Sequence, residues 1–308
     1  MLGEFPLKDK IVAITGGGSG IGLAFVKYAL SLDARVLIGD LSLTTDAEKL
    51  IAQQNKDSDK RNGSGGGGGG GDAVCHSVSV AFIPCDVAKW DQLQNLIDKA
   101  KEVFGDVPDV YVPCAGIFEP PRSNFWLDRE QEEDRYATLD INVTHPIKFT
   151  RMAMRALLGH KKKGVVLLIS SIAGLDGVYG KPLYAAAKHA IVGFVRSMSV
   201  AEQQFGIKVV GICPGIVDTP IWNDEGELLS CYQPDRAQML RPELIAASMM
   251  KLIQKGEYTG GTVYLETGEV SKVVYKGFEN DPGNITAIET LPGVRLVGKQ
   301  MRKQMEML

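Results

Sequence analysis

A tyrosine and a lysine stand four residues apart in the segment PLYAAAKHAIVGF, residues 182–194. Tyr184, Lys188 and Ile191 have the spacing of one helix face, so the predicted helix carries a phenol and an ammonium on an otherwise apolar stripe. A free phenol has a pKa of roughly 10, and a cation one turn away favours its ionised form, so this pair could exchange a proton near neutral pH. The alternative is structural: a core tyrosine with a satisfied hydroxyl, and a lysine whose ammonium reaches water.

A second candidate is the glycine-rich segment TGGGSGIG, residues 15–22, which follows an apolar run and opens a predicted helix. Glycines allow a tight turn and let the backbone approach a pyrophosphate, whose charge is stabilised at a helix N-terminus. A tight turn without a ligand is the alternative, but the position between strand and helix favours cofactor binding. The residues predicted to bind are Gly16, Ser19, Gly20, Ile21 and Gly22.

An acidic residue, Asp40, ends the second apolar run. A carboxylate there can accept hydrogen bonds from both hydroxyls of an adenosine ribose, and it repels a 2′-phosphate. No Arg or Lys lies in the glycine loop or directly after Asp40, so the sequence predicts NAD rather than NADP; a solvated acid at a strand end is the alternative. Later runs end in further predicted cofactor contacts: Asp86 and Val87 at the adenine edge, and Ala115 and Gly116 against the cofactor.

The elements that must position these residues alternate between apolar runs and helical patterns. Continuous Val, Ile and Leu runs indicate strands that helices cover on both faces. We therefore predict an α/β fold, a single Rossmann-like, doubly wound, parallel seven-stranded sheet with helices on both faces. The predicted strands are 10–15, 35–39, 80–85, 109–113, 165–170, 208–213 and 261–266, and helices begin near Ile21, Thr44, Lys89, Glu133, Tyr184 and Pro242.

Two segments interrupt this order. Residues 55–72 contain seven consecutive glycines and almost nothing apolar, so we predict a disordered surface loop, with an interaction segment as the alternative. Residues 267–308 lie beyond the last predicted strand and end in a short amphipathic pattern that could pack on the domain, cover the site or meet a partner. The predicted organisation is one domain, residues 1–266, with this insertion and a C-terminal extension, residues 267–308.

Composition narrows the class of protein. A net charge of −3 and a pI near 5.9 over 308 residues argue against nucleic acid as a main partner. The longest apolar run, GVVLLI, is too short to span a bilayer and no signal peptide is visible, so we predict a cytoplasmic protein without a membrane partner. Five scattered cysteines indicate reduced thiols, and neither they nor the four histidines have metal-ligand spacing, so no metal is predicted.

Five features together resemble the short-chain dehydrogenase/reductase family: TGGGSGIG, Asp40, ISSIAG, Tyr184-x-x-x-Lys188 and PGIVDTP. The resemblance extends from about residue 8 to about residue 266, interrupted by the glycine run. Within the family, PLYAAAKHAIVGFVRS and ICPGIVDTPIW are similar to the branch of the NAD-dependent 15-hydroxyprostaglandin dehydrogenases. The resemblance implies oxidation of a secondary alcohol, without implying a prostaglandin. It also implies a homodimer or homotetramer built on the helices beginning near Glu133 and Tyr184.

The same resemblance implies roles for four residues. Tyr184 would be the general base toward the alcohol, or the acid in the reverse direction. Lys188 would favour its ionised form and hold the nicotinamide ribose, and Ser171 would hydrogen-bond the substrate oxygen. Asn142 would hold a water in a proton relay; a helix-interior Asn bonded to a backbone carbonyl is the alternative.

The segment after the sixth predicted strand resembles the family's nicotinamide clamp, in which Val217 and Thr219 would bind the carboxamide. Residues 220–241 resemble the variable substrate loop. Its Trp222 and Tyr232 suggest a small, apolar substrate, although core packing is the alternative for Trp222.

One departure from the family concerns Pro113 and Cys114, which stand where two asparagines are usual. Both side-chain amides that brace the neighbouring strands are lost, and Pro113 removes a backbone donor. The leading prediction is an NAD-dependent secondary alcohol dehydrogenase. The alternatives are an NAD(P)H-dependent ketone reductase of a biosynthetic pathway, and a cofactor-binding scaffold with little turnover, which only this departure and the glycine insertion support.

Overall fold

The protein is described by a computed structural model, which covers residues 1–63, 78–127, 135–222, 235–277, 300 and 303. Tyr232 and residues 64–72 of the predicted glycine-rich insertion lie outside these residues. None of the helices in the described part of the chain is long and apolar enough to cross a bilayer.

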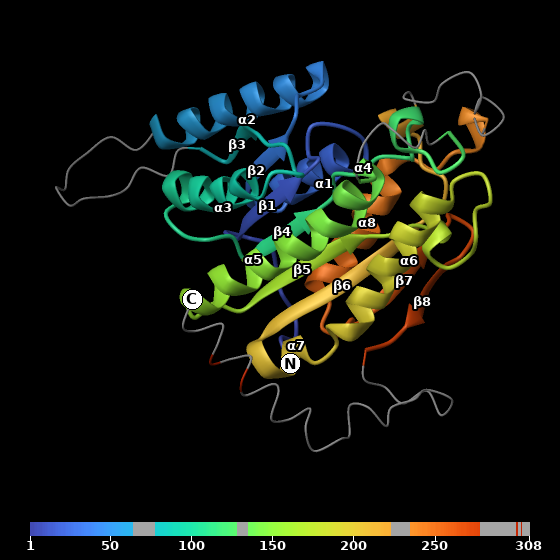
Figure 1. The fold of residues 1–308 in the computed structure, drawn as a ribbon. Coiled ribbons are helices and arrows are strands. Elements are labelled where there is room, and N and C mark those ends of the chain that lie inside the picture. Colours follow the sequence, from blue (N-terminus) through green and yellow to red (C-terminus); the bar gives the residue numbers. More distant parts are fainter. Residues whose placement is uncertain (64–77, 128–134, 223–234, 278–299, 301–302, 304–308) are drawn as a thin grey trace.

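In the described part of the chain, the centre of the fold is one sheet of eight strands, in the order β3-β2-β1-β4-β5-β6-β7-β8 (Figure 1). All neighbours pair in parallel except β7 and β8, which are antiparallel. The doubly wound sheet is therefore confirmed. The strands are β1 Ile11–Thr15, β2 Arg35–Asp40, β3 Val80–Pro84, β4 Val110–Pro113, β5 Gly164–Ile169, β6 Ile207–Pro214, β7 Val263–Glu266 and β8 Ser271–Tyr275.

The eighth strand corrects the predicted count of seven. β8 falls in the segment that we assigned to a C-terminal extension, and it pairs with β7 through a tight turn in which the Thr267 N–H donates to the Val270 carbonyl at 3.0 Å. None of its five residues is fully buried. An edge strand with such a weak apolar pattern gives little periodic signal in the sequence.

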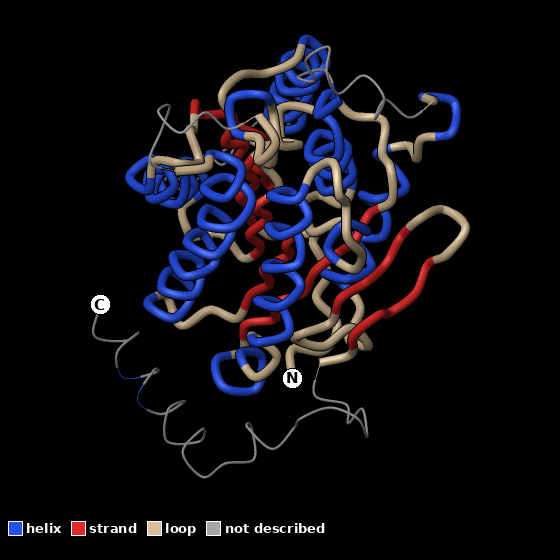
Figure 2. The backbone as a smooth tube through the Cα atoms, turned by 45° about the vertical axis from the view of Figure 1, so that its right-hand side comes forward, coloured by secondary structure: helices blue, strands red, loops and turns tan. Residues whose placement is uncertain are grey.

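Helices cover both faces of the sheet (Figure 2). α1 and α8 pack on one face, around Val12 and Ile14, while α3, α5 and α6 pack on the other, around Ile11 and Ala13. This alternation along β1 explains why a strand that is buried throughout reads as continuously apolar. The helices are α1 Gly20–Ser31, α2 Thr45–Gly63, α3 Trp90–Phe104, α4 Ala137–Leu139, α5 His145–Gly159, α6 Pro182–Ser197, α7 Ala201–Phe205 and α8 Pro242–Gln254.

The second helix corrects another prediction. α2 extends to Gly63, so residues 55–63 are helical although we predicted a loop from residue 55. Polar composition argues against burial, but a helix forms its backbone hydrogen bonds internally, so a polar segment can still be helical. The remainder of the predicted insertion, residues 64–72, lies outside the described residues.

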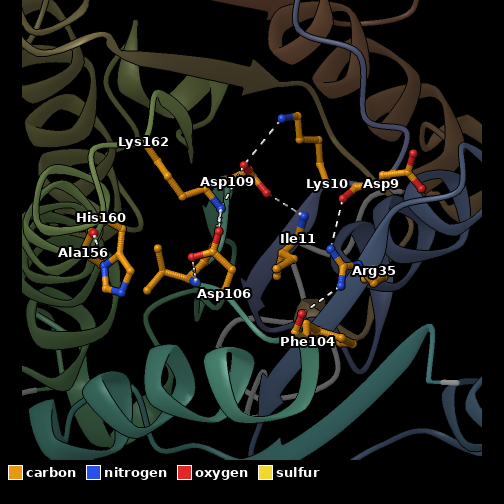
Figure 3. Close-up of polar contacts among 11 residues, drawn as sticks. Asp9, Lys10, Ile11, Arg35, Phe104, Asp106, Asp109, Ala156, His160 and Lys162 are labelled. Atoms are coloured by element: carbon orange, nitrogen blue, oxygen red, sulfur yellow. Dashed lines mark hydrogen bonds and ion pairs between the residues drawn. The ribbon is translucent and has the colours of Figure 1, made fainter. Parts of the chain in front are cut away.

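An ion-pair cluster lies where β1 and β4 begin, at the opposite end of these strands from the glycine loop (Figure 3). Asp109, which is 5 % exposed, accepts a hydrogen bond from the Ile11 N–H at 2.9 Å. Lys162 Nζ lies 3.1 Å from Asp109 Oδ1 and 2.9 Å from Asp106 Oδ2. The side chain of Asp109 therefore ties β1 to the beginning of β4 and to the turn that follows α5.

Asp109→Ala is expected to lower the free energy of unfolding by about 2 kcal/mol, because the buried Ile11 N–H loses its acceptor. Asp109→Asn keeps an acceptor of the same size and should lose clearly less. Urea denaturation of the two variants measures the difference. Equal stability of Asp109→Ala and wild type would contradict this account of the cluster.

Candidate active site

A cavity of about 550 Å³ opens at the carboxyl edge of the parallel strands. Sequence-distant segments meet there because the first six strands all end at this edge. Sixteen of the eighteen predicted site residues line it: Gly16, Ser19, Gly20, Ile21, Gly22, Asp40, Asp86, Val87, Ala115, Gly116, Ser171, Tyr184, Lys188, Val217, Thr219 and Trp222. The other two are Asn142, which lies beside the cavity, and Tyr232, outside the described residues.

The glycine loop lies against the backbone that follows β4. Gly16 has a φ of +68°, and a Cβ there would lie 2.6 Å from the Ala115 Cα, so no other residue fits without displacing that strand end. Gly20 begins α1, and the side chain of the preceding Ser19 makes no capping hydrogen bond. The first N–H groups of α1 therefore lie at the cavity wall, where they can bind a phosphate.

The carboxylate of Asp40 is held at the opposite side of this loop. Its Oδ2 accepts from the Gly18 N–H at 2.8 Å, and its Oδ1 accepts from the Leu41 N–H at 2.7 Å. These bonds fix the carboxylate beside the loop, and Asp40 lines the cavity together with Asp86 and Val87. A helix N-terminus for phosphate and a carboxylate for ribose hydroxyls fit a dinucleotide.

A buried histidine braces the strand end where the two asparagines are missing. The Thr15 Oγ1 accepts from the Cys114 N–H at 3.2 Å and lies 3.1 Å from His145 Nε2. His145 Nδ1 lies 3.0 Å from the Ile141 carbonyl. Burial lowers the pKa of His145 to about 4, so the ring is neutral: Nδ1–H donates to Ile141 and Nε2 accepts from the Thr15 hydroxyl. This chain links β1, the loop after β4 and α5 without a side-chain amide.

Tyr184 and Lys188 meet on the first turns of α6, as the spacing predicted. Both are buried, at 8 % and 7 % exposure, and the Lys188 Nζ lies 5.3 Å from the centre of the Tyr184 ring. Burial raises the pKa of Tyr184 to about 12, and a hydrogen bond with Ser171 partly opposes that rise. Burial also lowers the pKa of Lys188 to about 8, and its ammonium donates to the Ile169 carbonyl at 3.1 Å.

Two adjacent serines after β5 have different surroundings. Ser170 is buried and its hydroxyl donates to the Lys188 carbonyl at 2.8 Å, which ties the strand end to α6. Ser171 is half-buried, and its Oγ accepts from the Ala173 N–H at 3.2 Å. Ser171 also makes a side-chain hydrogen bond with Tyr184, so it can contact a substrate oxygen there, while Ser170 holds the helix.

Asn142 lies in a five-residue π-helical turn, Asp140–Thr144, between α4 and α5. Its Oδ1 accepts from the Ile117 N–H at 3.0 Å, and its Nδ2 donates to the Ile117 carbonyl at 2.8 Å. The side chain thus pairs with the loop after β4, which is close to the alternative of a backbone-bonded Asn. Its predicted role with a water in a proton relay is not tested by these contacts.

The segment after β6 forms the far wall. Trp222 donates from Nε1 to the Val217 carbonyl at 2.9 Å, and its ring lies 4.8 Å from that of Phe118. Phe118 in turn contacts Tyr184 edge to face at 4.7 Å. Trp222 therefore lines the cavity and also packs against the protein, so both readings of this residue apply.

Three residues of the site carried no usable sequence signal. His145 and Glu119 are buried polar residues whose partners are distant in sequence, and Phe118 is one apolar residue in a loop. The sequence feature that indicated their region was the replacement of two usual asparagines by Pro113 and Cys114, because other groups must then hold the end of β4.

Comparison with known proteins agrees with this geometry. The family model described as short chain dehydrogenase matches residues 72–228, just over half of the chain. The 15-hydroxyprostaglandin dehydrogenase [NAD(+)] of Bos taurus is 28% identical over 278 residues, 85% of this chain and 93% of that protein. The L-fucose dehydrogenase of Bos taurus is 27% identical over 256 residues, 83% of this chain and 82% of that protein.

A solved structure supports the fold. The crystal structure of gox2181 superposes with a TM-score of 0.66 and 22% identity, over 85% of this chain and 95% of that one. At this identity the likeness concerns the architecture alone.

Proposed function

Because the chain belongs to the short chain dehydrogenase family, we propose that it oxidises a secondary alcohol to a ketone with NAD as the hydride acceptor. The observation that carries the proposal is one cavity that joins the glycine loop and Asp40 to Tyr184, Lys188 and Ser171. The curated NAD-dependent relatives support the same choice of cofactor.

The side chains of this chain perform binding and proton transfer in the proposal. The bound cofactor supplies the hydride acceptor. Ser171 hydrogen-bonds the alcohol oxygen and holds it beside the Tyr184 hydroxyl. Tyr184 takes the hydroxyl proton as the general base, and the Lys188 ammonium lowers the cost of the phenolate. Without a ligand, the phenol pKa of about 12 keeps Tyr184 protonated, so binding of a cationic nicotinamide favours the base form.

The proposed substrate is small and apolar on its distal side. Beyond the residues placed for the cofactor, the cavity wall is formed by aliphatic and aromatic side chains: Ile117, Phe118, Val178, Ile221 and Trp222. An apolar wall contributes binding energy by removing apolar substrate surface from water and offers no partner for a charged group.

A ketone reductase is the second candidate function, and the protonated phenol favours it. A general acid must hold its proton before the reaction, and the raised pKa of Tyr184 ensures that it does. The reaction would use the same residues in the opposite direction. Turnover of 1-phenylethanol with NAD⁺ and of acetophenone with NADPH, under matched conditions, separates the two.

The first experiment is calorimetry of NAD⁺ and NADP⁺ binding to wild type and Asp40→Ala. We expect wild type to bind NAD⁺ selectively, and Asp40→Ala to bind NAD⁺ roughly 10-fold to 100-fold more weakly, because the ribose loses hydrogen bonds to a charged acceptor. Selectivity against NADP⁺ should fall as well. Asp98→Ala, on the exposed face of α3, is the control and should bind as wild type does. Preference of wild type for NADP⁺ would refute the assignment of NAD, and absence of binding of both dinucleotides would refute the cofactor site itself.

A further inference from the structure

Glu119 is a fully buried carboxylate in the loop after β4, at 0 % exposure. Its φ of +44° lies in the left-handed region, which a non-glycine residue adopts only when its surroundings hold it there. The two residues before it, Ile117 and Phe118, line the active-site cavity. Neither the proposed reaction nor the cofactor uses this carboxylate, so its contacts need another explanation.

The carboxylate binds the first turn of α6, on which Tyr184 lies. Its Oε2 accepts from the Tyr184 N–H at 2.9 Å, and the Leu183 N–H also donates to it. Its Oε1 accepts from the Phe125 N–H at 3.0 Å. The residue that precedes α6, Lys181, makes no side-chain capping hydrogen bond. Glu119 therefore supplies, from 65 residues away, the acceptor that an N-cap side chain usually provides.

A buried lysine accompanies this carboxylate. Lys181 is 0 % exposed, and its ammonium donates to the carbonyl of Glu119 at 3.2 Å and lies 4.9 Å from the centre of the Phe118 ring. Burial raises the pKa of Glu119, while the bonds from Phe125 and Tyr184 and the charge of Lys181 lower it. The charge of Lys181 and the positive end of the α6 dipole both favour an ionised carboxylate.

The same short loop segment also contacts the ring of Tyr184. Phe118 packs edge to face on that ring at 4.7 Å. Asn142 holds Ile117 by both of its backbone groups, at 3.0 and 2.8 Å. Residues 117–119 are thus fixed by Asn142 at one end and by α6 at the other, and they hold both the backbone and the ring of Tyr184.

We propose that Glu119 is a positioning residue for Tyr184. The carboxylate of Glu119 caps α6 from across the site and thereby fixes the phenol of Tyr184 relative to Ser171 and Lys188. The proposal rests on the proposed function, because it assumes that Tyr184 transfers the proton. Glu119 touches neither substrate nor cofactor in this role.

The test is Glu119→Gln, measured with NAD⁺ and 1-phenylethanol, 2-octanol and cyclohexanol as substrates. The amide keeps the size of the side chain but cannot accept from both Tyr184 and Phe125. We expect kcat to fall about tenfold or more, since small displacements of a catalytic group have large effects, while KM and the Kd of NAD⁺ stay within about twofold.

Glu202→Gln is the matched control. Glu202 is also buried, at 5 % exposure, and its Oε2 accepts from the Gly260 N–H at 2.7 Å, away from the cavity lining. If both carboxylates were merely structural, each substitution should lower the free energy of unfolding and leave kcat of the folded protein unchanged. Wild-type kcat in Glu119→Gln, or an equal loss of kcat in both variants, would overturn the proposal.

Glu119→Gln could fail to fold, and the panel could contain no substrate. A second variant addresses the first case, and a measurement that needs no turnover addresses the second. Glu119→Asp keeps the charge but withdraws the carboxylate by one methylene. Ultraviolet difference titration, with Tyr184→Phe as the background, follows ionisation of Tyr184 alone. We expect its midpoint to rise by at least about half a unit, because the phenol moves away from Ser171, whose hydrogen bond lowers its pKa. An unchanged midpoint in folded Glu119→Asp would refute the positioning role.

Tyr184→Phe separates failure of this proposal from failure of the proposed function. If Tyr184→Phe retains turnover, the proton-transfer role is wrong whatever Glu119 does. If Tyr184→Phe is inactive but Glu119→Gln has wild-type kcat, only the positioning role is wrong.

Discussion

Tyr184→Phe is expected to lower turnover of a secondary alcohol with NAD⁺ by about a thousandfold, a typical contribution of one general base. The ring itself should stay in place, because its edge-to-face contact with Phe118 does not need the hydroxyl. Cofactor binding should change little, since the glycine loop and Asp40 lie on other elements. Initial rates of NADH formation and calorimetry of NAD⁺ binding measure the two quantities.

The matched control for this variant is Tyr111→Phe. Tyr111 is fully buried in β4, and its hydroxyl has no hydrogen-bond partner among the described residues. Removing that hydroxyl should leave turnover unchanged and should not lower stability, because no bond is lost and an unpaired polar group disappears. Retention of more than about a tenth of wild-type turnover in Tyr184→Phe would exclude it as the essential base.

The fold was predictable because its signals are local and repeated. Each central strand is a continuous apolar run, and β1 shows why: Ile11 and Ala13 face one layer of helices while Val12 and Ile14 face the other. The segments that sequence reasoning missed have no such pattern. β8 is a half-exposed edge strand, and the end of α2 is a polar helix that needs no apolar face.

The candidate site was predictable where motif and backbone geometry coincide. Gly16 is required by the close approach of Ala115, and Tyr184 and Lys188 share a helix face, so both features can be read from spacing. The residues that support them could not be read in this way. Glu119 caps a helix from a distant loop, and His145 braces Thr15 from another helix. Such contacts depend on tertiary structure, and a buried polar residue looks in sequence like any exposed one.

The contacts that Thr15 makes with Cys114 and His145 also bear on the alternative of a cofactor-binding scaffold with little turnover. Its main support was the loss of two asparagines at Pro113 and Cys114. The Cys114 N–H nevertheless donates to Thr15, whose hydroxyl is oriented by His145. The strand end beside the glycine loop is therefore held by other groups, so this departure is a weak argument against catalysis.

Lys188→Met is expected to lower turnover by about a thousandfold or more. The same substitution should nevertheless make the protein more stable at pH 7. Lys188 is 7 % exposed, and burial lowers the pKa of its ammonium from 10.5 to about 8. At about 1.4 kcal/mol per unit, keeping this group charged in the folded state costs roughly 3 kcal/mol. The variant also loses the hydrogen bond to the Ile169 carbonyl, which lowers the free energy of unfolding by about 1 kcal/mol. A net increase of about 2 kcal/mol in the free energy of unfolding is therefore expected.

The pH dependence of that gain tests its cause. Between pH 8 and pH 10.5 the unfolded chain binds a proton at Lys188 that the folded protein does not, so wild-type stability rises with pH over this range relative to the variant. The advantage of Lys188→Met should therefore be largest below pH 8 and shrink toward pH 10.5, as measured by urea unfolding.

Lys208→Met is the control for activity. The pKa of Lys208 is also lowered to about 8 by burial, but its ammonium donates to the Ile253 carbonyl at 2.8 Å, at the end of α8. Turnover should be unchanged in this variant, because Lys208 does not line the cavity. If Lys188→Met were less stable than wild type at pH 7, the buried ammonium would have to be stabilised by the fold itself. Its position beside Tyr184 would then be a structural preference, rather than a charge that function keeps at a cost to stability.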